Sequence, residues 1–118
     1  MDIMFKSTRG DKNYVTASQA IVQGIANDGG LFVPETIPTI DFPLEKITEM
    51  SYQELAYEVL KLILTDYTEE ELKYCINSAY DEKFDTKLIA PLVSAGNGNF
   101  LELFHGKTIA FKDMALSI

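Results

Sequence analysis

One lysine near the carboxyl end of the sequence stands where it could act as a nucleophile. The apolar residues from Phe111 to Ile118 recur at the spacing of a helical face, so we expect Lys112 in the first turn of a helix. The positive end of the helix dipole and desolvation by apolar neighbours both favour the neutral amine that attacks a carbonyl. The position suits a Schiff-base lysine, although in an arbitrary protein such a residue is most often a solvated surface charge.

The residues ahead of Lys112 predict the elements that position it. The apolar run Phe100–Phe104, interrupted only by Glu102, is typical of a mostly buried strand. His105 and Gly106 break this run, and glycine allows a chain to turn sharply. We therefore expect a strand, a turn and then the helix that carries the lysine, with His105 in a position to form part of an active-site wall.

The stretch from His105 to Asp113, HGKTIAFKD, resembles the H-G-P-T-x-A-F-K-D signature of threonine synthases. These are pyridoxal-phosphate (PLP) enzymes of fold type II, the tryptophan synthase β-like group. The resemblance implies that Lys112 carries the cofactor covalently. Lys107 departs from the pattern, because the family usually has proline there; its absence frees the backbone φ at that turn and adds a charge.

A second stretch with the same resemblance lies far from the first. Residues 20–34, AIVQGIANDGGLFVP, are similar to an A-x-x-x-G-x-A-x-D-G-G-L-[FY]-V-P run in the family, and residues 7–10, STRG, look like its amino terminus. Taken alone, Asp28 is more typical of a turn-forming residue than of a functional one. Arg9 could bind an anion, but an exposed loop arginine is the commoner case. The two distant stretches support each other.

The resemblance implies a reaction for a whole enzyme of this family. Such a lyase converts O-phospho-L-homoserine and water into L-threonine and phosphate, in threonine biosynthesis, with PLP as the electron sink. Lys112 would hold PLP and act as general base for the proton transfers. Phe111 would pack near the cofactor and Asp113 would cap or orient the helix start, so we expect these three as cofactor-binding residues.

The resemblance spans essentially the whole sequence but only the amino-terminal part of the family's chain. A fold type II enzyme needs a large body after its cofactor lysine, so we expect an amino-terminal fragment, inactive and without PLP by itself. Residues 1–94 would form the amino-terminal domain, and residues 95–118 would begin the PLP-binding catalytic domain. The missing catalytic body would be its main partner, and the exposed apolar stripe of the last helix could also allow self-association.

Two alternatives remain open. The chain could be a noncatalytic packing or interaction module that docks on a catalytic body, which describes an isolated fragment better than catalysis does. It could also belong to another fold type II PLP enzyme, such as a relative of threonine dehydratase or cysteine synthase. The D-G-G-L-F-V-P block together with H-G-x-T-x-A-F-K-D favours threonine synthase.

Composition excludes several other classes. A net charge of -8 over 118 residues makes a nucleic acid or an anionic membrane an improbable partner, since phosphate contacts need clustered lysine and arginine. There is one cysteine and one histidine, and we expect no acidic cluster around His105, so few ligands remain for a metal and we expect no metal site. No apolar run approaches the roughly 20 residues of a membrane helix. The single cysteine and the absence of a signal-peptide pattern favour the cytoplasm.

Local patterns predict the remaining elements. Three capping boxes, at residues 16–19, 51–54 and 68–71, predict helix starts. The apolar stripe of the third helix comprises Leu72, Cys75, Ile76, Ala79 and Tyr80. The place of Cys75 in this stripe favours a buried thiol over a nucleophile. Short apolar runs predict strands at residues 3–5 and 31–33. Further strand and turn expectations are a return strand at residues 12–15, an unassigned stretch at residues 88–93 and a turn at residues 96–99.

The predicted fold class is therefore α/β (α+β), with a small sheet of short strands packed by about three capped helices. By resemblance, this would be the amino-terminal domain of a fold type II PLP enzyme.

Overall fold

All three predicted helix starts are present in the computed structural model, which describes residues 2–118. Thr16 caps α1 (Ala17–Gln23) in a complete capping box with Gln19. In the next two helices, a glutamate of the first turn accepts from the backbone N–H of the cap residue, Glu54 Oε2 from Ser51 at 2.7 Å and Glu71 Oε2 from Thr68 at 2.8 Å. These backbone hydrogen bonds lower the pKa of both glutamates. The helices are α2 (Tyr52–Leu60) and α3 (Glu69–Ala79).

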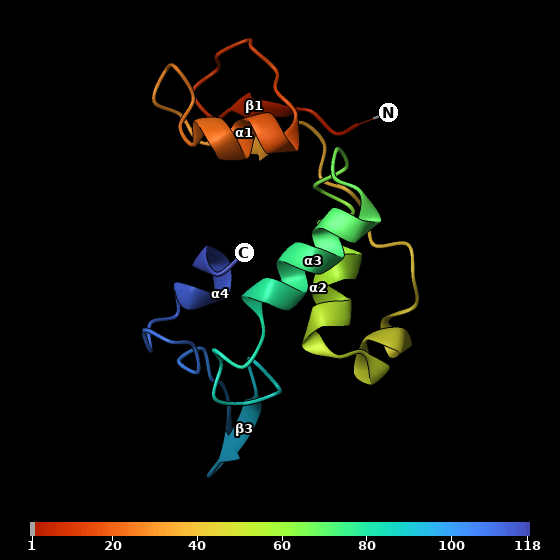
Figure 1. Cartoon of the computed structure of the whole chain (residues 1–118), viewed down its shortest axis with the longest axis vertical. Helices are drawn as coiled ribbons and strands as arrows, with labels where there is room; N and C mark the ends of the chain where they lie inside the picture. Colours follow the sequence, from red (N-terminus) through yellow and green to blue (C-terminus); the bar gives the residue numbers. More distant parts are fainter. Residues whose placement is uncertain (1) are drawn as a thin grey trace. The chain divides into compact units, whose positions relative to one another are not determined.

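The chain forms two compact units, and each unit draws on two parts of the sequence. The first runs up to Phe42 and also includes Glu58–Leu72; the second comprises Pro43–Tyr57 and Lys73–Ile118. Helices and small antiparallel sheets occur together, which confirms the predicted α+β class (Figure 1). None of the helices within residues 2–118 is long and apolar enough to cross a membrane. The other elements are β1 (Phe5–Ser7), β2 (Phe32–Pro34), the 3-10 helix η1 (Leu44–Glu49), β3 (Leu92–Ala95), β4 (Gly98–Leu101) and α4 (Asp113–Leu116).

In the first unit, β1 pairs with β2 in antiparallel register, with Lys6 opposite Val33. The expected hairpin between residues 3–5 and 12–15 is wrong, because Val15 makes only an isolated bridge to Phe5. The stretch before Val15 is polar and exposed, so it offers β1 little apolar surface to pair with, whereas β2 supplies Phe32. The core packs Phe5 and two alanines of α1 against partly buried apolar residues, namely Ile3, Val15, Phe32, Ile63, Leu64 and Tyr67.

In the second unit, β3 and β4 form a hairpin in which Val93 lies opposite Phe100. The expectation of a mostly buried strand over Phe100–Phe104 is wrong in two respects: the strand begins at Gly98, and its apolar side chains are exposed. The stretch at residues 88–93 that showed no periodicity contains the first two residues of β3, whose four residues are all exposed. A strand exposed on both faces leaves no alternation of apolar and polar residues for a sequence pattern to reveal.

The remaining expectations concern α3, the last helix and the domain boundary. Leu72 and Ile76 are buried as their spacing predicts, but Cys75 is only half-buried. The last helix is shorter than predicted, because α4 comprises one turn and Lys112 immediately precedes it. The division between residues 94 and 95 falls inside β3 and remains a prediction.

Candidate cofactor-lysine site

Lys112 lies at the amino end of α4 with its side chain exposed to solvent. Its carbonyl accepts from the backbone N–H groups of Ala115 and Leu116, at 3.0 and 2.8 Å, so its backbone is already part of the helical turn. Within residues 2–118 its ammonium has no hydrogen bond or ion pair. The desolvation expected from apolar neighbours is therefore not supplied by this part of the chain. The amine is instead unpaired and accessible on a structured backbone.

Asp113, the next residue, fastens the loop in front of the lysine. Its carboxylate accepts from the backbone N–H of Thr108 at 2.8 Å and from the Thr108 hydroxyl at 2.6 Å, and the residue is 9% exposed. A Cβ added at Gly106 would lie 2.5 Å from the Cβ of Asp113, so the close approach requires glycine. Asp113 thus orients the loop rather than capping the helix start with its side chain.

The same loop contains a strained residue three positions before the lysine. Ile109 has φ of 65°, in the left-handed region that a β-branched side chain rarely adopts. Such conformations cost about 1–3 kcal/mol and persist where the surrounding contacts hold the backbone in place. Here the Ile109 N–H bonds to the Gly106 carbonyl at 3.0 Å, beside the two bonds between Thr108 and Asp113. The loop is therefore held in one conformation by several contacts.

Tyr80, the residue directly after α3, fixes the backbone that follows the lysine. Its hydroxyl donates to the Met114 carbonyl at 2.6 Å, which ties α4 to a buried aromatic ring. Burial raises the pKa of Tyr80 to about 12, so the hydroxyl keeps its proton at neutral pH. The ring packs edge-on against Tyr52, with centroids 4.8 Å apart. Periodicity placed Tyr80 on an apolar stripe but carried no sign of this bond, because Met114 contributes only a backbone carbonyl.

His105, at the start of this loop, has a carboxylate beside each of its ring nitrogens. Its two ring nitrogens lie 2.5 Å from Asp85 Oδ1 and 2.8 Å from Glu102 Oε2. The interpretation that no acidic groups surround it is wrong, since these two carboxylates flank the ring. Among the residues that the structure describes, no group of three or more His, Cys, Asp and Glu side chains is arranged to hold a metal ion.

The first unit contains a different polar cluster, centred on Asp28. Its carboxylate accepts from the Ser7 hydroxyl at 2.6 Å and from the N–H groups of Asp11 and Gly30, each at 2.9 Å. These bonds, that of Ser7 first, lower the pKa of Asp28. Arg9 is exposed and donates to the Asp28 carbonyl at 3.4 Å. The STRG and NDGG stretches therefore meet in one hydrogen-bonded turn.

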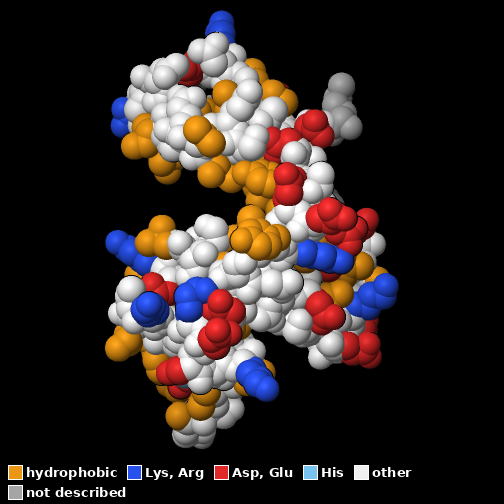
Figure 2. Space-filling model, viewed as in Figure 1, with side chains coloured by type: hydrophobic (Ala, Val, Ile, Leu, Met, Phe, Trp, Pro, Cys, Tyr) orange, Lys and Arg blue, Asp and Glu red, His pale blue; other side chains and the backbone are white. Residues whose placement is uncertain are grey.

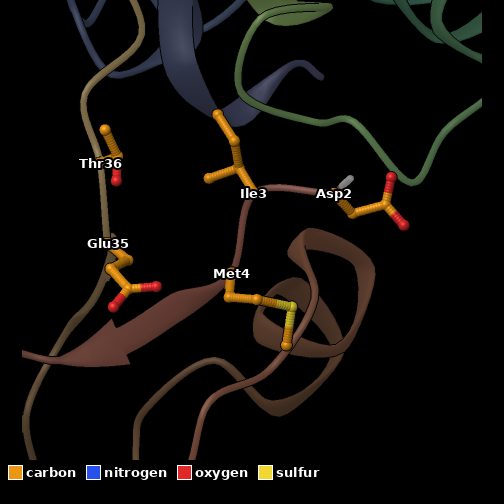
Figure 3. Close-up of a pocket in the computed structure, with 5 residues that line it drawn as sticks. All are labelled: Asp2, Ile3, Met4, Glu35 and Thr36. Carbon is orange, nitrogen blue, oxygen red and sulfur yellow. The ribbon is translucent and has the colours of Figure 1, made fainter.

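A hollow in the first unit lies beside the start of the chain and the residues that follow β2. Figure 3 shows its five lining side chains, and two of them, Asp2 and Glu35, are carboxylates. The others are Ile3, Met4 and Thr36, so the lining contains no amine that could hold an aldehyde. This hollow is therefore no candidate for the cofactor, and the lysine of the HGKTIAFKD stretch, Lys112, remains the candidate.

Comparison with known proteins identifies the family. A family model described as the threonine synthase N terminus matches residues 4–80, which is more than half of the chain. The chain belongs to this family. The resemblance seen in residues 7–10 and 20–34 is thereby confirmed.

Relatives extend the similarity beyond residue 80, to the loop that carries Lys112. Threonine synthase from Schizosaccharomyces pombe is 40% identical over an alignment that covers 97% of this chain and 23% of the relative. The crystal structure of threonine synthase from yeast superposes with a TM-score of 0.87 at 36% identity, over 98% of this chain and 24% of that one. A PLP-bound threonine synthase from Brucella melitensis gives 0.84 at 35%, over 98% and 25%. The chain thus spans about a quarter of the length of the relatives it matches.

Not all relatives carry the same name. The proteins called threonine synthase-like 2 from mouse and human are 37% and 38% identical to this chain, with 96% of the chain aligned in each case. These identities overlap those to the threonine synthases of fungi and bacteria, for example 38% for that of Pseudomonas aeruginosa. Overall identity therefore does not separate the two groups, and an activity must be argued from the site.

Proposed function

We propose that this chain contributes the cofactor lysine to a PLP-dependent threonine synthase, which converts O-phospho-L-homoserine and water into L-threonine and phosphate. The observation that carries the proposal is Lys112 itself: an unpaired, exposed amine on a loop that its neighbours hold in place. The relative from Brucella melitensis is PLP-bound. In this chain, the stretch that resembles the family presents the amine of Lys112, the group with which a PLP aldehyde reacts.

The residues around the amine fit this role. Lys112 would hold the cofactor covalently and then move protons at the substrate carbon next to the amino group. Phe111 is 66% exposed beside it and would cover one side of the cofactor. Asp113 would keep the lysine in position through its bonds to Thr108. When bound, PLP supplies the electron sink for the substrate carbanions.

The proposal extends to organisation and location. Residues 1–94 would form an amino-terminal domain and residues 95–118 the start of the PLP-binding domain. In a protein as long as its relatives, the groups that bind the cofactor phosphate and the pyridine nitrogen would come from the remaining length. A cytoplasmic location agrees with the single cysteine, Cys75, which has no partner for an internal disulfide.

A second candidate function, a noncatalytic docking module, is favoured by the exposed apolar side chains. Figure 2 shows such side chains at the surface in orange. In the second unit, exposed apolar residues gather in the hairpin and in the segment around Lys112, namely Leu92, Val93, Phe100, Leu101, Ile109, Phe111, Leu116 and Ile118. A docking module would need this surface but not the amine of Lys112.

A chimera separates the two candidates. Residues 1–118 would replace the matching amino-terminal part of threonine synthase from Schizosaccharomyces pombe, and the purified chimera would be assayed for phosphate release from O-phospho-L-homoserine. We expect activity that Lys112→Ala abolishes and that Lys107→Ala retains, since Lys107 is an exposed lysine of the same loop. Circular dichroism would show that each chimera is folded, and cofactor absorption would show whether PLP is held through Lys112. A folded Lys112→Ala chimera with full activity would refute the cofactor role and favour the docking module.

A further inference from the structure

His105 occupies the start of the loop that ends at Lys112, and its surroundings indicate a role in positioning. The imidazole is 14% exposed and lies between two carboxylates that come from different elements. Asp85 belongs to the segment after α3, and Glu102 directly follows β4. The Asp85 N–H also donates to the His105 carbonyl at 3.1 Å, so side chain and backbone are both joined to that segment.

The geometry determines the charge of the ring. A neutral imidazole has one N–H and one lone pair, so it can donate to only one carboxylate. Both nitrogens of His105 lie within hydrogen-bond distance of a carboxylate oxygen, Asp85 on Nδ1 and Glu102 on Nε2. Only the imidazolium satisfies both contacts as a donor while both carboxylates are ionised. The ring also stacks on Phe104, with centroids 4.6 Å apart, which fixes its plane.

We propose that His105 acts as a charged latch, positioning the loop that presents Lys112 by holding its first residue between Asp85 and Glu102. The end of the loop is already held, because Asp113 bonds to Thr108 and Tyr80 bonds to Met114. The latch fastens the start. This inference rests on the proposed function only in assuming that the loop presents a cofactor lysine. The contacts of His105 can be tested without any cofactor.

The latch depends on pH with a definite sign. Hydrogen bonds to Glu102 and then to Asp85 raise the pKa of His105, and these two carboxylates are the charged groups that act on it. A group whose pKa is raised on folding contributes its stability below its unfolded pKa of about 6.5 and loses it as pH rises through the folded value. The loop should therefore loosen above that value. Glu102 should matter more than Asp85, since the Asp85 side chain is 73% exposed and that of Glu102 only 26%.

The experiment is an NMR titration of the 118-residue chain. His105 is the only histidine, so its imidazole signals are assigned without ambiguity. We expect a titration midpoint above 6.5 that falls in Glu102→Gln and, by less, in Asp85→Asn. Glu82→Gln is the matched control, because Glu82 is exposed and does not contact the ring. The Thr108 amide, which donates to Asp113, reports the loop. After correction for intrinsic exchange, the protection of this amide should fall several-fold as pH rises through the titration midpoint of His105. A variant that shifts the midpoint should shift the loss of protection to the same pH.

Three results would overturn the latch. They are a midpoint at or below 6.5 in the unmodified chain, midpoints that neither carboxylate variant moves, and Thr108 protection that does not follow the titration. The unmodified chain alone decides the first and the third, so a variant that fails to fold does not leave the question open. Loss of activity in the Lys112→Ala chimera belongs to the proposed function, and this titration neither uses nor requires it.

Discussion

The Asp28 cluster and the Lys112 loop resemble the same family in sequence, but they use their polar groups in opposite ways. In the cluster, the Asp28 carboxylate receives three hydrogen bonds from its own unit. In the loop, Asp113 is satisfied in the same manner, yet the adjacent Lys112 makes no polar contact within residues 2–118. Hydrogen bonding therefore distinguishes Asp28 and Asp113, which hold the backbone in place, from Lys112, whose amine remains free to react.

Each region also contains a glycine that the packing requires. A Cβ at Gly30 would overlap the Ser7 hydroxyl and lie 3.0 Å from the Arg9 backbone nitrogen. A Cβ at Gly106 would meet the side chain of Asp113. The difference lies in the consequence: Gly30 closes a turn inside a hydrogen-bonded cluster, whereas Gly106 sets the loop that presents the lysine. Substitutions in the two regions should therefore affect different properties.

The largest effect on stability is expected from Gly30→Ala. The added methyl must displace the Ser7 hydroxyl and would crowd the Arg9 backbone nitrogen and the Asp28 carboxylate. We expect it to lower the free energy of unfolding by about 3 kcal/mol. Urea denaturation followed by circular dichroism measures this. As a control, Gly96→Ala meets no atom within 4 Å and carries only the cost of its φ of 59°, about 1 kcal/mol. Equal losses in the two variants would contradict the close packing at Gly30.

Gly106→Ala should have a smaller effect on global stability, about 2 kcal/mol, and a local one on the loop. The methyl would push the Asp113 side chain away from Thr108, so the Thr108 amide should lose its protection from hydrogen exchange. The Asp11 amide, which donates to Asp28, should keep its protection. A uniform loss at both amides would mean that the two regions do not respond separately.

Ile109→Gly should stabilise the chain by about 1 kcal/mol, because glycine adopts the left-handed backbone without strain. The isoleucine side chain is 73% exposed, so little packing is lost. Ile109→Ala is the control, since alanine keeps the strain at φ of 65° and should give no such gain. Thermal unfolding distinguishes them. If both variants destabilise, the Ile109 side chain makes a contribution that its exposure conceals.

Phe100→Ser should change the free energy of unfolding least, by within about 0.5 kcal/mol, because the ring is exposed on the hairpin. It should instead weaken any self-association of the chain, which an exposed apolar surface promotes. Sedimentation at several concentrations measures this. Ile21→Ser, an equally exposed apolar position on α1 in the other unit, is the control. An equal effect of both variants would show that association has no preference for the hairpin.

The parts of the fold that were predicted correctly from the sequence are those that depend on residues close together in the chain. The three capping boxes join residues three positions apart, and all three are formed. The strands were predicted less well. β1 is displaced by two residues and pairs with β2 instead of residues 12–15, since strand pairing is decided by apolar surface elsewhere in the chain. The first strand of the hairpin, β3, was missed because its four residues are all exposed.

The sequence by itself determined the family, the starts of α1, α2 and α3 and the identity of the candidate lysine, because capping and signature residues act through type and short spacing. Only the tertiary structure decided what holds that lysine in place. Asp85 reaches His105 across 20 positions and Tyr80 reaches Met114 across 34. Contacts over such separations depend on how the elements pack, which no local pattern encodes. The tertiary structure likewise showed that Asp28, expected to be a turn-forming residue, accepts hydrogen bonds from Ser7 and Asp11 and so joins two stretches that are distant in sequence.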